Sequence, residues 1–272
     1  MNNVTHREKK RTDSRAPRLL IVKQVRYLTP NMIRVTFAGA SLKGISLECA
    51  GANCKIMIPE QDQDRDEFIS QMHDGPRPIT RTYTVRSIKA DPLELDIDFV
   101  AHGENGPASK WAMNAKPGDF CGFAGPGPAK VTDFYADWYL VAADMAALPV
   151  ALATLEAMPE NASGVAIFEV LSEEDKQEIT VPNGIKVHWM VSPDPYTPSV
   201  KQIEFVEKME WPQGIVQTCI AGESSVVRTL RDHVNNQRSI ERKHTYISGY
   251  WKIGLIEDEH QAYKREANTI ER

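Results

Sequence analysis

The segment Leu93-Glu94-Leu95-Asp96-Ile97-Asp98-Phe99-Val100 alternates apolar and acidic residues almost strictly. Side chains of a β-strand point to opposite faces with a period of two. The pattern therefore predicts a strand with its apolar face against a core and its acidic face in water. The turn signal Asp91-Pro92 precedes it, as expected where a strand begins.

Similar short apolar runs surround this segment, at residues 19–22 and 32–37. Turn residues separate the runs, as at Thr29-Pro30-Asn31, Gly39 and Lys116-Pro117-Gly118-Asp119. Several short strands with regular turns predict a small antiparallel β-barrel. We assign this barrel to residues 19–133.

The pattern changes from about residue 134, where apolar strand-like runs alternate with helical segments. Strands are expected at residues 138–142, 164–170, 185–190, 214–221 and 244–247, and helices at 145–158 and 223–236. Such alternation predicts an α/β domain with a parallel sheet, an architecture that binds nucleotides. We assign it to residues 134–272, with a polar helix or tail at its end.

Length and charge restrict the class of protein. A chain of 272 residues suits two domains, and 42% hydrophobic with 25% charged residues is ordinary for a soluble protein. The net charge of −5 argues against general nucleic-acid binding. Residues 1–18 are basic and are expected to form a disordered leader.

Several functional classes are not supported by any motif. The longest apolar stretch, residues 139–155, is interrupted by Asp144 and Pro149, and no apolar signal region follows the N-terminal charges. We therefore expect no membrane insertion and a cytoplasmic location. We also expect a monomer, although no motif determines the oligomeric state. The four cysteines form no Cys-x-x-Cys pair, so we expect buried thiols and no metal held by the protein.

The tetrapeptide Arg81-Thr82-Tyr83-Thr84 lies on another candidate strand of the barrel. Arg81 and Tyr83 would point to one side of that strand, where a guanidinium can hold phosphate and an aromatic ring can stack on an isoalloxazine. Thr84 would add its hydroxyl or its backbone N–H. These groups suit a flavin; the alternative is an ordinary strand with a cross-strand Arg and Tyr.

A glycine-rich turn follows the strand at residues 93–100. Within it, Gly106-Pro107-Ala108-Ser109 places a proline at a first helical position, so a short helix is expected to begin there. Free N–H groups at a helix N-terminus favour a pyrophosphate, although the segment could also be a simple turn. His102 is a candidate contact to the cofactor or a structural side chain.

Taken together, these motifs resemble the siderophore-interacting protein family, the bacterial ferric-siderophore reductases of the ferredoxin-reductase-like flavoprotein superfamily. The likeness covers nearly the whole chain beyond the leader, in the same order. It is carried by Arg81-Thr82-Tyr83-Thr84, His102-Gly103, residues 106–112, Pro117-Gly118-Asp119, Gly125-Pro126-Gly127, residues 143–149, Ala221-Gly222-Glu223 and Gly249-Tyr250-Trp251-Lys252.

The resemblance implies an FAD-binding barrel followed by an NAD(P)H-binding domain. The candidate FAD-binding residues are Arg81, Thr82, Tyr83, Thr84, His102, Gly106, Pro107, Ala108, Ser109, Tyr250 and Trp251. The candidate NAD(P)H-binding residues are Asp144, Ala146, Glu169, Gly222 and Glu223. Tyr250 and Trp251 would flank the isoalloxazine, or else they are core aromatics of a terminal strand.

The resemblance also implies a basic triad for a ferric siderophore, formed by Lys55, Lys130 and Lys252. An anionic chelate approaching a net negative protein needs such a local positive patch. The alternative is that each lysine is only a solvated surface charge, and spacing alone would not select these three.

The chain departs from the family at one turn. Ala143-Asp144-Met145-Ala146 stands where the family usually has Gly-Asp-Glu-Thr, and no Gly-x-Gly-x-x-Gly fingerprint is present. Both features weaken the argument for nicotinamide binding at this turn. The acidic run Glu173-Glu174-Asp175 would repel a 2′-phosphate and so favours NADH, unless it is only a solvated loop.

The function that the resemblance implies is electron transfer from NAD(P)H through FAD to Fe³⁺ in a siderophore, with release of Fe²⁺. Since the cofactor performs the chemistry, no catalytic residue is expected beyond it. The alternatives are a reductase fed by ferredoxin, which the altered turn favours, a non-enzymatic ferric-siderophore-binding protein, and a general flavin or ferric-chelate reductase.

Overall fold

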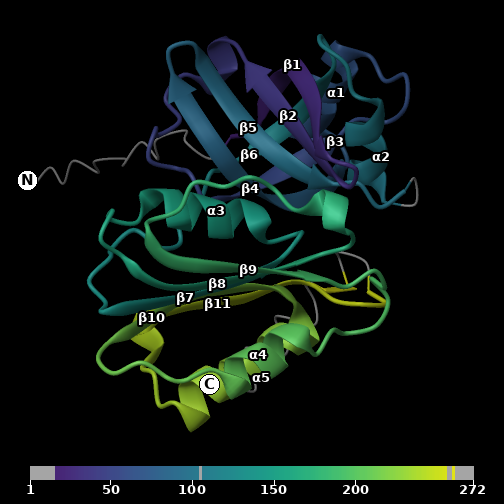
Figure 1. The fold of residues 1–272 in the computed structure, drawn as a ribbon. Coiled ribbons are helices and arrows are strands. Elements are labelled where there is room, and N and C mark those ends of the chain that lie inside the picture. Colours follow the sequence, from purple (N-terminus) through teal and green to yellow (C-terminus); the bar gives the residue numbers. More distant parts are fainter. Residues whose placement is uncertain (1–15, 104–105, 256–258, 261–272) are drawn as a thin grey trace, which may run out of the picture.

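The protein has two domains in a computed structural model that describes residues 16–103, 106–255, 259 and 260 (Figure 1). The first contains a closed barrel of strand order β1-β2-β5-β4-β3-β6, and the second a five-stranded sheet of order β11-β10-β7-β8-β9. Neighbouring barrel strands are antiparallel and those of the sheet are parallel. The predicted fold class is confirmed.

The barrel domain consists of six strands and short helices. The strands are β1 (Arg18–Thr29), β2 (Met32–Ala38), β3 (Asn53–Ile58), β4 (Ile79–Ala90), β5 (Leu93–Val100) and β6 (Phe120–Ala124). The helices are η1 (Ala40–Leu42), α1 (Arg65–Asp74) and α2 (Pro107–Asn114). Of these, η1 and α1 were not predicted from the sequence; α1 begins where the Asp64 carboxylate accepts hydrogen bonds from the N–H groups of Asp66 and Glu67.

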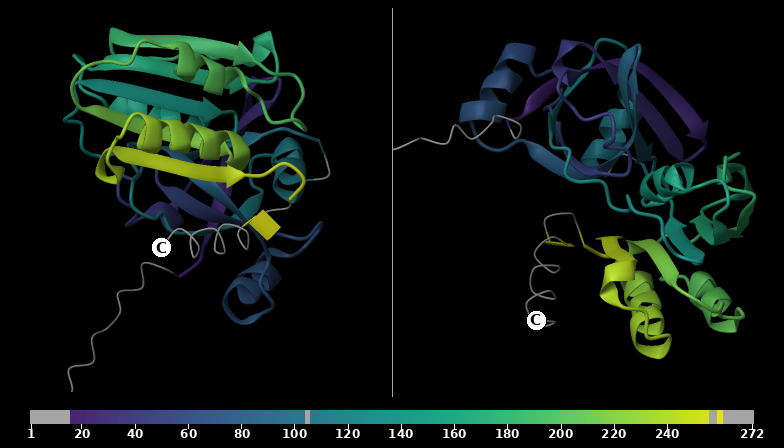
Figure 2. Two further views of the ribbon diagram at one scale, coloured as in Figure 1. Left: turned by 90° about the horizontal axis from the view of Figure 1, so that it is seen from below. Right: turned by 90° about the vertical axis from the view of Figure 1, so that its left-hand side faces the viewer.

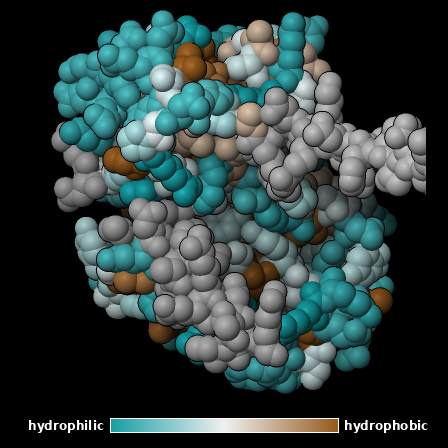
Figure 3. Space-filling view, turned by 180° about the vertical axis from the view of Figure 1, so that it is seen from behind, coloured by the Kyte–Doolittle hydropathy of each residue, from teal (hydrophilic) through white to brown (hydrophobic). Residues whose placement is uncertain are grey.

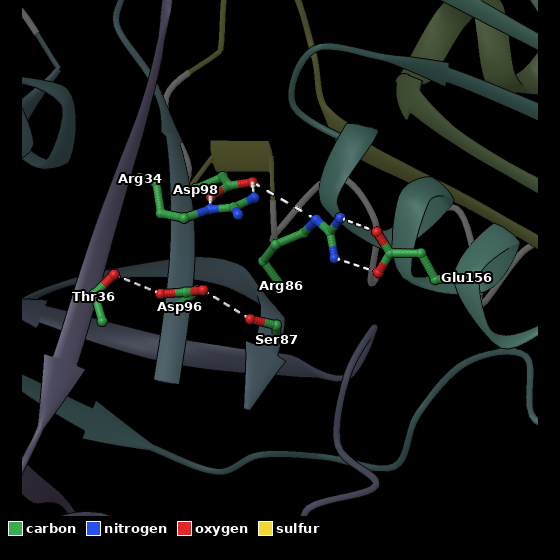
Figure 4. Close-up of polar contacts among 7 residues, drawn as sticks. All are labelled: Arg34, Thr36, Arg86, Ser87, Asp96, Asp98 and Glu156. Atoms are coloured by element: carbon green, nitrogen blue, oxygen red, sulfur yellow. Dashed lines mark hydrogen bonds and ion pairs between the residues drawn. The ribbon is translucent and has the colours of Figure 1, made fainter. Parts of the chain in front are cut away.

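The alternating strand β5 has its apolar side chains in the barrel core, but its acidic face does not lie in water. Asp96 and Asp98 are only 8% and 6% exposed. Asp98 receives two hydrogen bonds from the Arg34 guanidinium, at 2.7 and 2.8 Å, and Asp96 accepts from Thr36 and Ser87 (Figure 4). The expectation of a solvated face was wrong because neighbouring strands supply partners that the local pattern cannot show.

The second domain alternates strands and helices. Its strands are β7 (Trp138–Asp144), β8 (Ser163–Val170), β9 (Gly184–Val191), β10 (Val216–Glu223) and β11 (Thr245–Trp251). Its helices are α3 (Leu148–Ala157), η2 (Glu173–Asp175), α4 (Lys201–Lys208), α5 (Ser224–Asp232), η3 (His233–Gln237) and η4 (Arg242–His244). Helix α3 lies between the sheet and the barrel, whereas α4 and α5 lie on the opposite face of the sheet (Figure 1).

The position of α3 explains the long apolar stretch in the sequence. All eight residues from Leu148 to Leu155 are buried, because the helix packs on β7 and β10 on one side and on barrel strand β4 on the other. A helix that is apolar all round must be covered all round. Burial of each large aliphatic side chain contributes about 1.5–3 kcal/mol of transfer free energy.

An ion pair joins the two domains at this helix. The guanidinium of Arg86, on β4, forms a bidentate pair with the carboxylate of Glu156 near the end of α3 (Figure 4). Arg86 is 8% exposed, and its Nε also lies 3.9 Å from Asp98 Oδ2. The chain of charges Arg34–Asp98–Arg86–Glu156 thus runs from the barrel wall into the second domain.

A second joint is formed by Asp175, the last residue of η2, which is fully buried. Its carboxylate accepts hydrogen bonds from Thr29 Oγ1 at 2.8 Å and from Asn31 N and Nδ2 at 3.0 and 2.8 Å. Ser172 Oγ donates a fourth, at 2.9 Å. Burial raises the Asp175 pKa, but the hydrogen bonds outweigh it and hold the pKa below its usual value.

Other expectations concern burial and membrane insertion. All four cysteines are free and buried, as expected for small apolar side chains. No helix in the described parts of the chain is long and apolar enough to cross a bilayer. Residues 1–15 of the predicted leader, and residues 256–258 and 261–272 of the predicted C-terminal helix or tail, lie outside the described residues; β1 begins at Arg18.

Two further views place the domains as adjacent lobes (Figure 2). On the face shown in Figure 3, hydrophobic residues form small separate patches among hydrophilic ones.

We expect Asp175→Ala to lower the free energy of unfolding by about 3 kcal/mol, because it leaves a buried donor on Thr29 and half-buried donors on Asn31 without an acceptor. Urea unfolding followed by circular dichroism measures the change. Glu174→Ala removes the neighbouring carboxylate, which is exposed, and should change stability by less than about 0.5 kcal/mol. Equal effects of the two variants would contradict a joint at Asp175.

Candidate functional site

Strand β4 presents two different faces at residues 81–84. In its register with β3, Arg81 and Tyr83 lie opposite Ile56 and Cys54, whose side chains fill the barrel core. The Tyr83 ring packs on Phe99, with ring centroids 4.4 Å apart. Arg81 and Tyr83 therefore share one side of the strand, as the period of two predicts.

The turn after β5 leads into helix α2 at the same end of the barrel. Gly106 is the N-cap and provides no side-chain cap, and Pro107 begins the helix. Ser109 Oγ accepts a hydrogen bond from the His102 N–H at 3.1 Å. Trp111 of α2 packs on Phe99, which links the helix to Tyr83.

A Cβ at Gly106 would lie 2.3 Å from Cε1 of the His102 ring, so a larger residue there would displace that exposed side chain. The His102 ring thus lies beside the start of α2, although its side chain is exposed. An uncapped helix N-terminus, a glycine that allows close approach, a nearby aromatic ring and an arginine on β4 fit a flavin dinucleotide. Glu104 and Asn105 lie outside the described residues.

The other face of β4 carries Thr82 and Thr84, opposite Lys55 and Asn53 of β3. Lys55 Nζ donates to Thr82 Oγ1 at 2.5 Å, and Lys130 Nζ donates to Asn53 Oδ1 at 2.7 Å. The structure therefore brings two of the three predicted siderophore-binding lysines to one face of the β3–β4 pair.

The end of β11 reaches this face from the second domain. Tyr250 forms a side-chain hydrogen bond with Thr84, and its hydroxyl lies 3.1 Å from that of Tyr246. Burial raises the Tyr250 pKa well above its usual value, so this phenol stays protonated at neutral pH. Lys252 follows two residues later, and its carbonyl accepts from Leu255 N at 3.1 Å.

At the carboxyl edge of the parallel sheet, Asp144 connects three strands. One of its oxygens, Oδ2, accepts hydrogen bonds from Trp251 Nε1 and from Glu223 N, both at 2.7 Å. The edge lies between β7 and β10, where the strand order reverses and where α/β domains bind nucleotides. Trp251 is therefore not simply a core aromatic, since its indole N–H is used at this edge.

Local geometry explains the glycine beside Asp144. Gly222 has φ +149, and a Cβ there would lie 2.6 Å from Asp144 Oδ2. The next residue, Glu223, caps α5 by accepting from the N–H groups of Ser225 and Val226. Ala146 is half-buried in the turn between β7 and α3. The Asp144–Trp251 contact was not foreseen, and no local signal reveals a bond between residues 107 positions apart.

Burial perturbs two carboxylates of this edge. It raises the pKa of Asp144 to about 6, although hydrogen bonds from Trp251, Glu223 and Ala147 oppose the rise. It also raises the pKa of Glu169, at the end of β8, against hydrogen bonds from Ser199 and Ser192 and the charge of Lys201. With Glu223, three carboxyl groups line the edge expected to receive a nucleotide.

The acidic run after β8 does not form a single exposed patch. Asp175 is buried in the joint to the barrel, and Glu173 is paired with Lys176 at 2.5 Å. The run therefore presents fewer unpaired charges to a 2′-phosphate than the sequence suggests. In the described part of the chain, no three His, Cys, Asp or Glu side chains are grouped to hold a metal ion.

Comparison with known proteins identifies a family whose two domain descriptions match this chain. The family description "Siderophore-interacting FAD-binding domain" matches residues 21–130, and "Siderophore-interacting protein" matches residues 136–254. The ferric vibriobactin reductase ViuB of Vibrio cholerae is 34% identical over 93% of this chain and 95% of its own length.

Two further relatives align along nearly their full lengths. The crystal structure of the siderophore-interacting protein SipS from Aeromonas hydrophila is 31% identical with a TM-score of 0.81, over 94% of this chain and 99% of that one. The NADPH-dependent ferric-chelate reductase of Escherichia coli is 27% identical over 92% of this chain and 99% of its own.

The Asp144 pKa predicts a pH-dependent stability. Folding raises this pKa from 3.8 to about 6, so the folded state favours the protonated Asp144 carboxyl group. The resulting contribution of Asp144 to stability is fully present below about pH 4 and is lost as the pH rises through about 6. We expect the free energy of unfolding of the wild type, relative to Asp144→Asn, to fall by ~3 kcal/mol across this range.

Parallel denaturant titrations of the two proteins at several pH values measure this difference. Asn retains a side-chain oxygen for Trp251 and Glu223 but does not ionise. Because the charge of Glu169 contributes to the raised Asp144 pKa, both proteins are also compared in a Glu169→Gln background. A difference that is constant with pH would contradict the raised pKa.

Proposed function

The chain belongs to the siderophore-interacting protein family, and we propose that it reduces ferric siderophores with electrons that a pyridine nucleotide supplies through FAD. The observation that carries the proposal is the position of Lys55 and Lys130. Both ammonium groups lie on the face of β3–β4 that is lined by Thr82 and Thr84, within the tetrapeptide that matches the flavin motif. A binding site for an anionic chelate would thus lie next to the flavin site.

FAD supplies the step between a two-electron donor and a one-electron acceptor. One NAD(P)H would thereby reduce two Fe³⁺ to two Fe²⁺ and release one proton. The protein would bind and orient the cofactor and the substrates and exclude water from them. Arg81 and the N-terminus of α2 would hold phosphate, and Tyr83 would pack beside the ring system.

The proposed FAD site comprises Arg81, Thr82, Tyr83, Thr84, His102, Gly106, Pro107, Ala108, Ser109, Tyr250 and Trp251. The proposed NAD(P)H site comprises Asp144, Ala146, Glu169, Gly222 and Glu223, and the proposed siderophore site Lys55, Lys130 and Lys252. The proposed domain limits are residues 19–133 and 134–272, and the proposed setting is the cytoplasm, with the protein acting as a monomer.

We propose NADH as the donor, because Glu169 lies at the end of β8, where an acidic side chain suits a ribose hydroxyl. The relative from Escherichia coli is called NADPH-dependent, so both nucleotides belong in the test. Reduced ferredoxin is a second candidate donor. The observation in its favour is the Ala143–Ala146 turn, which lacks the polar residues usual in the family.

The purified protein is expected to be yellow, and its flavin absorption to bleach anaerobically with NADH faster than with NADPH or reduced ferredoxin. Addition of a ferric siderophore should restore the absorption and produce Fe²⁺, measured with a colorimetric ferrous chelator. A colourless protein that binds ferric siderophore without turnover would instead support a carrier. Equal rates with all ferric chelates would support a general reductase.

Arg81→Ala and Tyr83→Ala are each expected to weaken FAD binding about tenfold, because each removes a direct contact worth roughly 1.5 kcal/mol. The FAD content of the purified variants and titration of their apoproteins with FAD measure the change. Lys89→Ala removes an exposed cation from the same strand and should keep the wild-type affinity. Unchanged FAD affinity in both site variants would contradict the assignment.

A further inference from the structure

Lys130 differs from Arg34 and Arg86, two other buried or half-buried cations of the barrel domain. Arg34 and Arg86 are each paired with a carboxylate, from Asp98 and Glu156. Among the residues that the structure describes, Lys130 has no carboxylate partner; its Nζ donates to the side-chain oxygen of Asn53 at 2.7 Å. A cation removed from water without a counter-ion is unfavourable, and burial accordingly lowers the Lys130 pKa.

The loop that carries Lys130 is built around the same asparagine. The backbone oxygen of Asn53 accepts a hydrogen bond from Gly127 N at 2.8 Å. A Cβ at Gly127 would lie 2.6 Å from Asn53 Oδ1, so only glycine leaves room for the side-chain oxygen that Lys130 uses. Gly125, with φ +113, turns the chain onto this position. Asn53 therefore holds the loop through its backbone and the lysine through its side chain.

The direction of the Asn53 side chain follows from the barrel. Cys54 and Ile56 are buried in the core, so Asn53 and Lys55 both point to the opposite face of β3. Lys130, which comes from a loop 77 residues away, is brought to this face by its bond to Asn53. Two ammonium groups thereby share one face beside Thr82 and Thr84.

We propose that Asn53 is the positioning residue of the acceptor site: it holds Lys130 beside Lys55 through a neutral hydrogen bond and leaves the positive charge of the lysine for an anionic ferric chelate. This inference rests on the proposed function. An amide fixes the ammonium without neutralising it, whereas a carboxylate at the same place would form an ion pair and cancel the charge. The missing counter-ion is then supplied by the substrate.

Asn53→Asp tests the proposal, because the substituted side chain has almost the same shape and still accepts from Lys130 but adds a negative charge. The holoenzyme is reduced anaerobically with dithionite, so that no nucleotide or ferredoxin is needed. Its reoxidation is followed by flavin absorption with increasing ferric tris-catecholate, which is anionic, or ferric tris-hydroxamate, which is uncharged. FAD content and thermal unfolding are measured on the same samples.

For the anionic chelate, we expect Asn53→Asp to raise the concentration needed for half-maximal reoxidation about tenfold. For the uncharged chelate, the same concentration should change less than about twofold. FAD content should stay at the wild-type level. Gln24→Glu, which adds the same charge at an exposed position of β1, should behave like the wild type with both chelates.

Lys130→Gln provides a second, independent variant. If Asn53 acts through Lys130, adding Asn53→Asp to Lys130→Gln should raise the half-maximal concentration much less than it does in the wild-type background. An equal increase in both backgrounds would contradict action through the lysine.

Each remaining outcome separates the possible failures. If neither chelate reoxidised the reduced wild-type protein, the proposed function itself would be wrong. Normal wild-type reoxidation with an unchanged Asn53→Asp response would overturn only the role of Asn53. Equal effects on both chelates, or loss of FAD from the variant, would overturn it in favour of a structural role or of a flavin phosphate as the counter-ion of Lys130.

Discussion

The bidentate ion pair between Arg86 and Glu156 joins the barrel to the second domain, and the arrangement of the candidate site depends on it. Arg86 lies two residues beyond Thr84 on β4, so one strand carries both the flavin motif and the joint between domains. A displacement of α3 relative to β4 would also move the sheet edge relative to the flavin. Asp175 provides a second joint, which attaches the η2 segment to the turn between β1 and β2. A buried charge is stable only when it is paired or hydrogen-bonded, so both joints favour one relative position of the domains.

Charges in this protein fall into two groups according to what compensates them. Some are matched by an opposite charge inside the chain: Arg34 with Asp98 in the barrel wall, and Arg86 with Glu156 between the domains. At the candidate site the balance is incomplete. Lys130 is held by an amide, and the sheet edge has carboxyl groups whose pKa values are raised by burial. Incompletely compensated charges are typical of sites that receive a ligand, because the ligand completes the balance. The positive face suits an anionic acceptor, whereas the acidic edge restricts how a nucleotide donor can approach.

Much of the fold was predictable because its signals are local. The alternation at residues 93–100 predicted a barrel strand, and the strand–helix alternation after residue 134 predicted the parallel sheet. Helix α1 was missed because its pattern is mostly polar, and η2 was interpreted only as a charged loop. The solvated acidic face of β5 was a wrong expectation, since Arg34 and Ser87 come from neighbouring strands. Of the candidate site, the residue types on β4 and at the start of α2 could be named in advance. Their partners could not.

The sequence by itself determined the order of the domains, the alternation of faces on each strand and the family that the motifs indicate. These depend on residues within one element, where spacing decides which side chains share a face. Only the tertiary structure decided that Asp175 binds the turn between β1 and β2, that Asp144 accepts from Trp251, and that Asn53 holds Lys130. These partners are separated by 144, 107 and 77 residues. The physical reason is that a hydrogen bond depends on distance in space, and no local pattern records which distant strand or loop will supply the other atom.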